Sequence, residues 1–104
     1  MTEEKINQLQ MYEQSLQSLL MQKQQFQTQI TEIESALGVM EPAKKVYKIV
    51  GNIMVDSTKE ELKDDLNTKK LKAEMRVRAL EKQESSIKEK VKTLQKEVID
   101  GMKD

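Results

Sequence analysis

Several residue types that usually carry chemistry are missing from this 104-residue sequence. It has no cysteine, no histidine and no tryptophan, and only one proline, three glycines and three aromatic residues. Without cysteine the chain forms no disulfide and offers no thiolate ligand, and without histidine it lacks the usual general base and the commonest nitrogen ligand for metals. The glycines Gly38, Gly51 and Gly101 lie far apart, so there is no glycine-rich phosphate loop. These absences argue against an enzyme.

The chemically active side chains that remain do not form a catalytic or metal-binding pattern. The serines of the helical segments have no base beside them that could activate a hydroxyl. Asp64 and Asp65 are neighbours, and neighbouring helix positions point about 100° apart. They suit a solvated first turn of a helix, favoured by the helix dipole, better than a shared metal. The sequence predicts no catalytic residue, no metal site and no cofactor.

Charge of one sign is not in excess, because eighteen Lys and Arg balance eighteen Asp and Glu. With no net positive field and only two arginines, we predict no nucleic-acid partner. No apolar stretch approaches the roughly 18 residues of a membrane span. The N-terminal sequence MTEEKINQLQ also lacks a basic region followed by an apolar run. We therefore expect a soluble, cytoplasmic protein with no membrane partner.

The sequence is instead rich in Gln, Glu, Lys and Leu, a bias typical of long helices and coiled coils. From Leu9 to Leu37, alternating steps of three and four residues select a row that is apolar except for one lysine. The row is Leu9, Tyr12, Leu16, Leu19, Lys23, Phe26, Ile30, Ile33 and Leu37. Gly38 then suits a left-handed cap, and Pro42 prevents the helix from resuming at once. The first helix is predicted over residues 3–37.

A second row with the same spacing predicts a second helix over residues 58–102. The row is Leu66, Lys70, Ala73, Val77, Leu80, Glu84, Ile87, Val91 and Leu94, and it continues to Val98. Two overlapping capping boxes mark the start of this helix, Ser57 with Glu60 and Thr58 with Glu61.

Between the rows lies VYKIVGNIMV, Val46 to Val55, in which β-branched and aromatic residues flank Gly51-Asn52. This dipeptide suits a two-residue hairpin turn. Such a hairpin pairs residues whose numbers add to 103, and the same rule pairs all nine positions of the first row with positions of the second. The sequence thus predicts a mainly α fold: a long antiparallel two-helix coiled coil, with arms on the order of 50 Å, joined by a single β-hairpin.

Lys23 and Glu84 are charged residues inside the two apolar rows, about one helical turn apart across the predicted interface. An ion pair between them would penalise slipped alignments of the helices while lowering net stability. We expect this pair to help set the register.

The hairpin has apolar side chains on both faces and two unpaired edges. Because a lone two-stranded hairpin is marginal in water, we predict that it pairs with hairpins of other chains and that together they close into an intersubunit β-barrel. The alternative is that the hairpin packs down on its own helices. The residues predicted to carry assembly are Val46, Tyr47, Ile49, Val50, Gly51, Asn52, Ile53, Met54 and Val55.

Apolar residues also lie outside the two rows near both termini, namely Ile6, Met11, Ile99 and Met102. Methionine is flexible and polarizable, so an exposed cluster of this kind can adapt to many apolar partners. The more specific hypothesis is that the tip of the coiled coil binds unfolded chains. The plainer one is frayed helix ends with scattered surface apolar residues, which are common.

The hairpin VYKIVGNIMV, the acidic helix start after it, and MRVRALEKQESSIKEKVKTL with its LEKQE pattern resemble the β-class subunit of prefoldin, a co-chaperone of archaea and eukaryotes. The resemblance covers nearly the whole chain as one domain, 1–104, and the simple pattern suggests an archaeal source. It implies a hexamer of two α-class and four β-class subunits, copies of this chain among them, whose hairpins form a double β-barrel platform.

The resemblance further implies an ATP-independent holdase that holds unfolded client proteins between arm tips and delivers them to a group II chaperonin. By their position, the residues expected to contact clients are Ile6, Leu9, Met11, Val98, Ile99 and Met102. The rival from another class is a coiled-coil tethering or oligomerisation module that never handles clients. An enzyme would require a bound cofactor or residues supplied by a partner.

Overall fold

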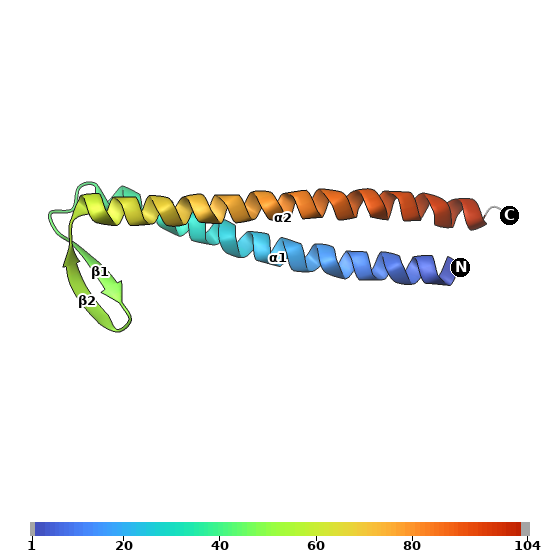
Figure 1. Cartoon of the computed structure of the whole chain (residues 1–104), viewed down its shortest axis with the longest axis horizontal. Coiled ribbons are helices and arrows are strands. Elements are labelled where there is room, and N and C mark those ends of the chain that lie inside the picture. The colour runs from blue at the N-terminus through green and yellow to red at the C-terminus, as the bar shows by residue number, and fades with distance from the viewer. Residues whose placement is uncertain (1, 103–104) are drawn as a thin grey trace. The chain divides into compact units, whose positions relative to one another are not determined.

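The computed structural model describes residues 2–102 as two long helices joined by one β-hairpin (Figure 1). The elements are α1 (Thr2–Met40), β1 (Val46–Val50), β2 (Ile53–Ser57) and α2 (Lys59–Met102). The chain divides into two compact units. One contains residues 2–24 and 77–102, and the other contains Gln25–Arg76, including the hairpin. In each unit a length of α1 runs antiparallel to a length of α2, as the row patterns predict.

The apolar rows form the interface between the helices. Every position of both rows is buried or half-buried, including the charged Lys23, Lys70 and Glu84. The buried apolar side chains are Leu19, Ile33, Met40, Ala73, Val77 and Leu80. No described side chain is less than 2% exposed, so the core is a narrow seam one layer deep. The stability of the helices therefore rests on this one strip of apolar contact.

The predicted end of the first helix is wrong. α1 continues through Gly38 to Met40, and Gly38 does not adopt the left-handed conformation that the cap required. The reason is Met40, which extends the row by one more step of three after Leu37 and is only 6% exposed. Burial of that side chain offsets the cost of about 1 kcal/mol for a helical glycine. The turn at Glu41 and Pro42 then ends the helix, because a proline disfavours helical geometry at the residue before it.

The hairpin register agrees with the prediction at every pair. Val50 pairs with Ile53, Ile49 with Met54 and Lys48 with Val55, so the numbers of each pair add to 103. Pairing extends two residues beyond the predicted stretch, to Ser57. Gly51 has φ of 62° while Asn52 does not have a positive φ, which is the pattern of a type II′ turn.

The start of α2 is fixed by Thr58. Its side-chain Oγ1 accepts a hydrogen bond from the backbone N–H of Glu61 at 3.1 Å, which satisfies one of the free amides of the first turn. Of the two predicted capping hydroxyls, Thr58 is the one used. The Ser57 hydroxyl instead donates to the Thr58 carbonyl at 3.4 Å.

The predicted ion pair across the seam is present. Lys23 Nζ donates to both carboxylate oxygens of Glu84, at 3.2 and 3.5 Å, and these side chains are only 18% and 16% exposed. Lys88 Nζ lies 3.8 Å from the same carboxylate. Lys5 with Glu97 and Lys70 with Glu34, each at 3.3 Å, link α1 to α2 nearer the solvent.

Candidate assembly and binding surfaces

The hairpin leaves its apolar side chains exposed on both faces. The exposed fractions run from 40% at Val55 to 69% at Ile49. The full set of exposed apolar residues on the strands is Tyr47, Ile49, Val50, Ile53, Met54 and Val55. The alternative that the hairpin packs down on its own helices is therefore wrong. An apolar ribbon exposed in this way is a typical protein–protein contact surface.

Each strand of the hairpin has one edge without a strand neighbour, because the described sheet contains β1 and β2 alone. A row of unpaired backbone N–H and C=O groups on such an edge is a template for pairing with another chain. Together, the two open edges and the two apolar faces give the hairpin the features of an assembly element.

The hairpin is tied to α2 at its base. β2 ends at Ser57 and α2 begins at Lys59, so a single residue, Thr58, separates them. On the other strand, Lys48 Nζ lies 3.2 Å from the Asp65 carboxylate. Lys59 Nζ donates to the Glu41 carbonyl at 2.9 Å and so links the connection after α1 to the start of α2. The hairpin is thus joined to α2 through Thr58 and through one ion pair.

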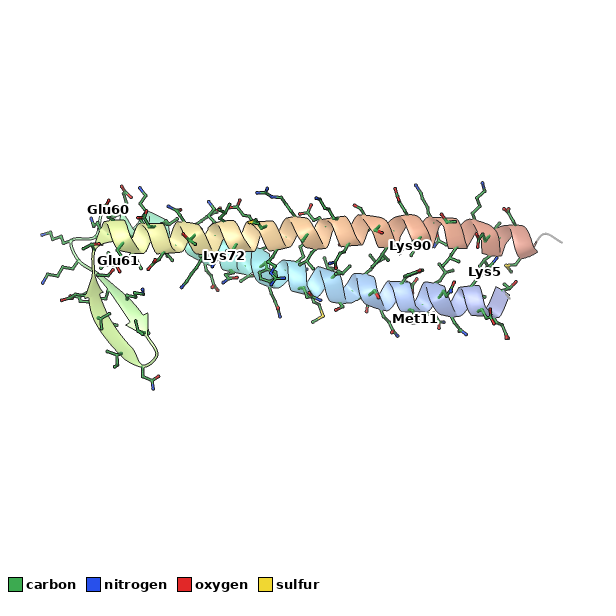
Figure 2. The ribbon with its side chains drawn as sticks, in the orientation of Figure 1. Lys5, Met11, Glu60, Glu61, Lys72 and Lys90 are labelled. Atoms are coloured by element: carbon green, nitrogen blue, oxygen red, sulfur yellow. The ribbon has the colours of Figure 1, made fainter. Side chains whose placement is uncertain are left out.

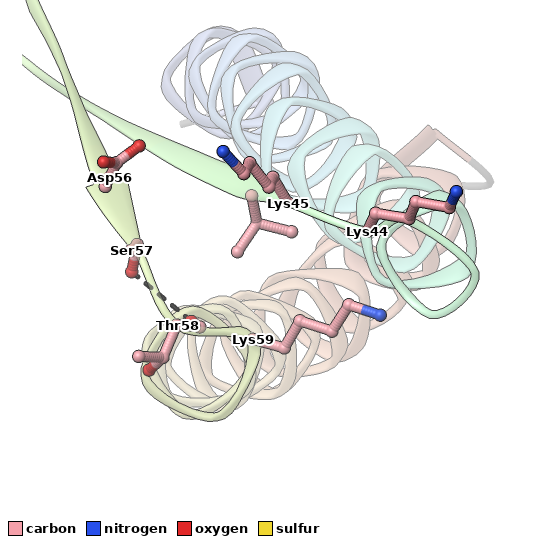
Figure 3. A pocket seen from close by; sticks show the side chains of 7 residues that line it. Lys44, Lys45, Asp56, Ser57, Thr58 and Lys59 are labelled. Carbon is pink, nitrogen blue, oxygen red and sulfur yellow. Dashed lines mark hydrogen bonds between the residues drawn. The ribbon is translucent and has the colours of Figure 1, made fainter.

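An open cavity of about 280 Å³ lies at the base of the hairpin (Figure 3). Its lining is polar apart from one valine and comprises Lys44, Lys45, Val46, Asp56, Ser57, Thr58 and Lys59. Figure 3 shows Ser57 and Thr58 leading from the end of β2 straight into the first turn of α2. The basic side chains that line the cavity are exposed to solvent.

The residues predicted to contact clients fall into two groups. Four lie exposed outside the seam: Ile6, Met11, Ile99 and Met102, of which Met102 is 74% exposed. The other two, Leu9 and Val98, are half-buried within the seam. Figure 2 shows Met11 and Lys5 on the first turns of α1. The exposed four lie in the unit that contains both termini, and they come from both helices.

No group of three His, Cys, Asp or Glu side chains within residues 2–102 is arranged to hold a metal ion. Neither α1 nor α2 has a stretch that is long and apolar enough to cross a membrane.

Comparison with known proteins gives a consistent result. The family model described as "Prefoldin subunit" matches residues 3–104. The prefoldin subunit beta of Pyrococcus abyssi is 38% identical over 96 residues, which cover 89% of this chain and 82% of that protein. The corresponding protein of Thermococcus kodakarensis is 39% identical over 92 residues, covering 86% and 79%.

The chain belongs to the prefoldin family. The crystal structure of the prefoldin beta subunit from Thermococcus strain KS-1 has a TM-score of 0.93 and 34% identity, and the match covers 99% of this chain and 93% of that one. These relatives are archaeal β subunits, so the class predicted from the single hairpin and the LEKQE pattern is confirmed. Prefoldins are a non-enzymatic chaperone family, and this chain is a prefoldin chaperone subunit.

Sequence reasoning missed several residues of this prefoldin chain. Met40 was detectable, because it continues the three-four spacing of the first row, but the glycine and proline signals outweighed it. The pairing of Lys48 with Asp65 has no sequence signal, since it depends on the angle between hairpin and helix. Leu71 and Met75 are further exposed apolar residues on α2, 55% and 58% exposed, and were not singled out.

Proposed function

We propose that this chain is one of four β-class subunits in a prefoldin hexamer with two α-class subunits, and that the hexamer acts in the cytoplasm as an ATP-independent holdase. The hairpins join the subunits through an intersubunit β-barrel. The arm tips hold unfolded proteins and deliver them to a group II chaperonin.

One observation carries the assembly part of this proposal. The hairpin exposes six apolar side chains and two strand edges, yet its base is tied to α2. Pairing with other hairpins satisfies the backbone edges and buries the apolar side chains at the same time. Membership of a family of subunits supports the same assignment.

Exposed apolar side chains near the termini support the client-binding part. Ile6, Met11, Ile99 and Met102 are 41–74% exposed and come from both helices. Two of the four are methionines, whose flexible side chains fit many apolar surfaces. Such contacts suit a client without a fixed shape.

The test is to co-express the chain with an archaeal α-class prefoldin subunit. Light scattering should give a six-chain mass, and the complex should suppress aggregation of an unfolding client protein in the absence of ATP. Transfer of the bound client to a purified group II chaperonin tests the delivery step. Failure to assemble with any α-class partner would contradict the hexamer.

A tip variant separates the holdase from a simple tethering module. Met11→Ser, Ile99→Ser and Met102→Ser combined should reduce client protection at least several-fold while the six-chain mass is unchanged. The control is Met21→Ser with Met75→Ser, which removes two methionines that are also more than half exposed but lie outside the predicted tip. Full protection by the tip variant would show that these residues do not hold the client, whereas lack of protection by the wild-type hexamer would favour the tethering module.

A further inference from the structure

The two faces of the hairpin differ in charge although both are apolar. Because side chains alternate along a strand and paired residues share a face, the register assigns every residue to one of two surfaces. The first, here called the lysine face, consists of Val46, Lys48, Val50, Ile53, Val55 and Ser57. The second, here called the tyrosine face, consists of Tyr47, Ile49, Met54 and Asp56.

The lysine face is turned toward α2. Lys48 lies in the middle of β1, and its Nζ reaches the Asp65 carboxylate of α2 at 3.2 Å. Val46, Lys48 and Ser57 on this face are half-buried. On the tyrosine face all four residues are exposed, even those at the base. The lysine face is therefore partly covered and contacts α2, whereas the tyrosine face stays exposed along its whole length.

A closed barrel of hairpins can accept only one of these faces on its inside. The interior of a small barrel is filled by side chains and excludes water. Turning the lysine face inward would place one Lys48 per chain in that interior and separate it from Asp65, and a buried charge without its partner is strongly unfavourable. The single charge of the tyrosine face, Asp56, lies one residue from the end of β2, where it can stay at the mouth of the barrel.

We infer that the tyrosine face is the surface that sister subunits cover, with Tyr47, Ile49 and Met54 packing against the same face of neighbouring prefoldin hairpins. The inference rests on the proposed assembly through hairpins. It assigns the lysine face to the outside of the barrel, where Lys48 keeps its contact with Asp65.

Two adjacent residues offer a matched test. Met54 and Ile53 are both 65% exposed and lie next to each other on β2, but they belong to opposite faces. Met54→Lys should raise the concentration needed for half-assembly with the α-class partner by at least tenfold. Ile53→Lys should change it by less than about threefold. Ile49→Lys and Val50→Lys form a second pair on β1 with the same expectation.

The absence of cysteine from the natural chain allows an independent readout. With an α-class partner that also lacks cysteine, the thiol of Ile49→Cys should become protected from a maleimide reagent on assembly. The thiol of Val50→Cys should remain reactive. Both thiols should react freely in the isolated chain, because both positions are more than half exposed.

The outcomes separate this inference from the proposed function. If the wild-type chain does not assemble, the proposed function fails. If the wild type assembles but Ile53→Lys and Val50→Lys block assembly as strongly as, or more strongly than, their neighbours, the face assignment is overturned and assembly stands. Protection of Val50→Cys without protection of Ile49→Cys would overturn the face assignment in the same way. Circular dichroism of each isolated variant confirms that the helices are unchanged.

Discussion

At the scale of single residues, two glycines occupy opposite situations. Gly51 has φ of 62° in the hairpin turn, whereas Gly38 lies inside α1 and a methyl group added there would have no neighbour within 4 Å. Gly51→Ala should lower the free energy of unfolding by about 1 kcal/mol or more, because an L side chain is strained at positive φ. Gly38→Ala should raise it by about 0.5–1 kcal/mol through helix propensity. Urea unfolding of the isolated chain, followed by circular dichroism, measures both. A stabilising Gly51→Ala would contradict the turn geometry.

The helix cap gives a second prediction for single residues. Thr58→Ala removes the acceptor for the Glu61 amide and should cost about 1 kcal/mol of stability. Ser57→Ala is the control, because the Ser57 hydroxyl donates to a carbonyl and caps no amide. Equal losses for the two variants in the same urea titration would show that the threonine hydroxyl is not the effective cap.

Among the secondary-structure elements, the half-buried ion pair between α1 and α2 tests how register is specified. Lys23→Leu alone leaves the Glu84 carboxylate half-buried with only Lys88, 3.8 Å away, and should cost about 1–3 kcal/mol. The double variant Lys23→Leu with Glu84→Leu should be as stable as the wild type or more stable. Thermal unfolding of the two variants and the wild type provides this comparison.

Alignment of the helices is the second readout for the same pair. Positions 16 and 87 face each other in the predicted register. A pair of cysteines at these positions should form a disulfide more readily in the natural background than in the double leucine variant. If the disulfide between positions 16 and 87 forms equally readily in both backgrounds, Lys23 and Glu84 do not set the register.

The elements also show which parts of the fold can be predicted from sequence. The seam and the hairpin register depend on short-range periodicity and on the Gly51-Asn52 turn, and both are readable without a structure. The end of α1 was mispredicted because the local signals of Gly38 and Pro42 compete with burial of Met40, which depends on packing against another element. The tie between Lys48 and Asp65 joins residues on a strand and a helix, so no local pattern indicates it.

For the candidate surfaces, the sequence predicted the apolar hairpin and the exposed apolar residues near the termini. It did not distinguish the two faces of the hairpin by their environment, because the half-burial of Val46 and Ser57 depends on packing around the ends of the strands. The exposure of Leu71 and Met75 was missed for a related reason: apolar residues outside a seam stand out only when their surroundings are known.

At the scale of the whole molecule, the proposed holdase depends on several arms acting together. Each tip offers a few exposed apolar side chains, so a single arm should bind clients weakly. Linked arms raise the effective concentration of the second and third contact, which increases overall affinity by about 10²-fold or more. The isolated chain, verified as a monomer by light scattering, should therefore protect an unfolding client far less than the hexamer at equal arm concentration. Aggregation monitored by light scattering measures this, and equal protection by the monomer would rule out the multivalent mechanism.

The common centre of the hairpin and the helical rows has a consequence for how such a chain can change during evolution. A heptad inserted into one helix shifts every contact that lies farther from the hairpin than the insertion, and the unmatched residues lose their apolar neighbours. A heptad inserted into both helices at mirrored positions leaves all other contacts in place. Changes in arm length should therefore be inherited as paired insertions or deletions, while the turn itself stays constant in length.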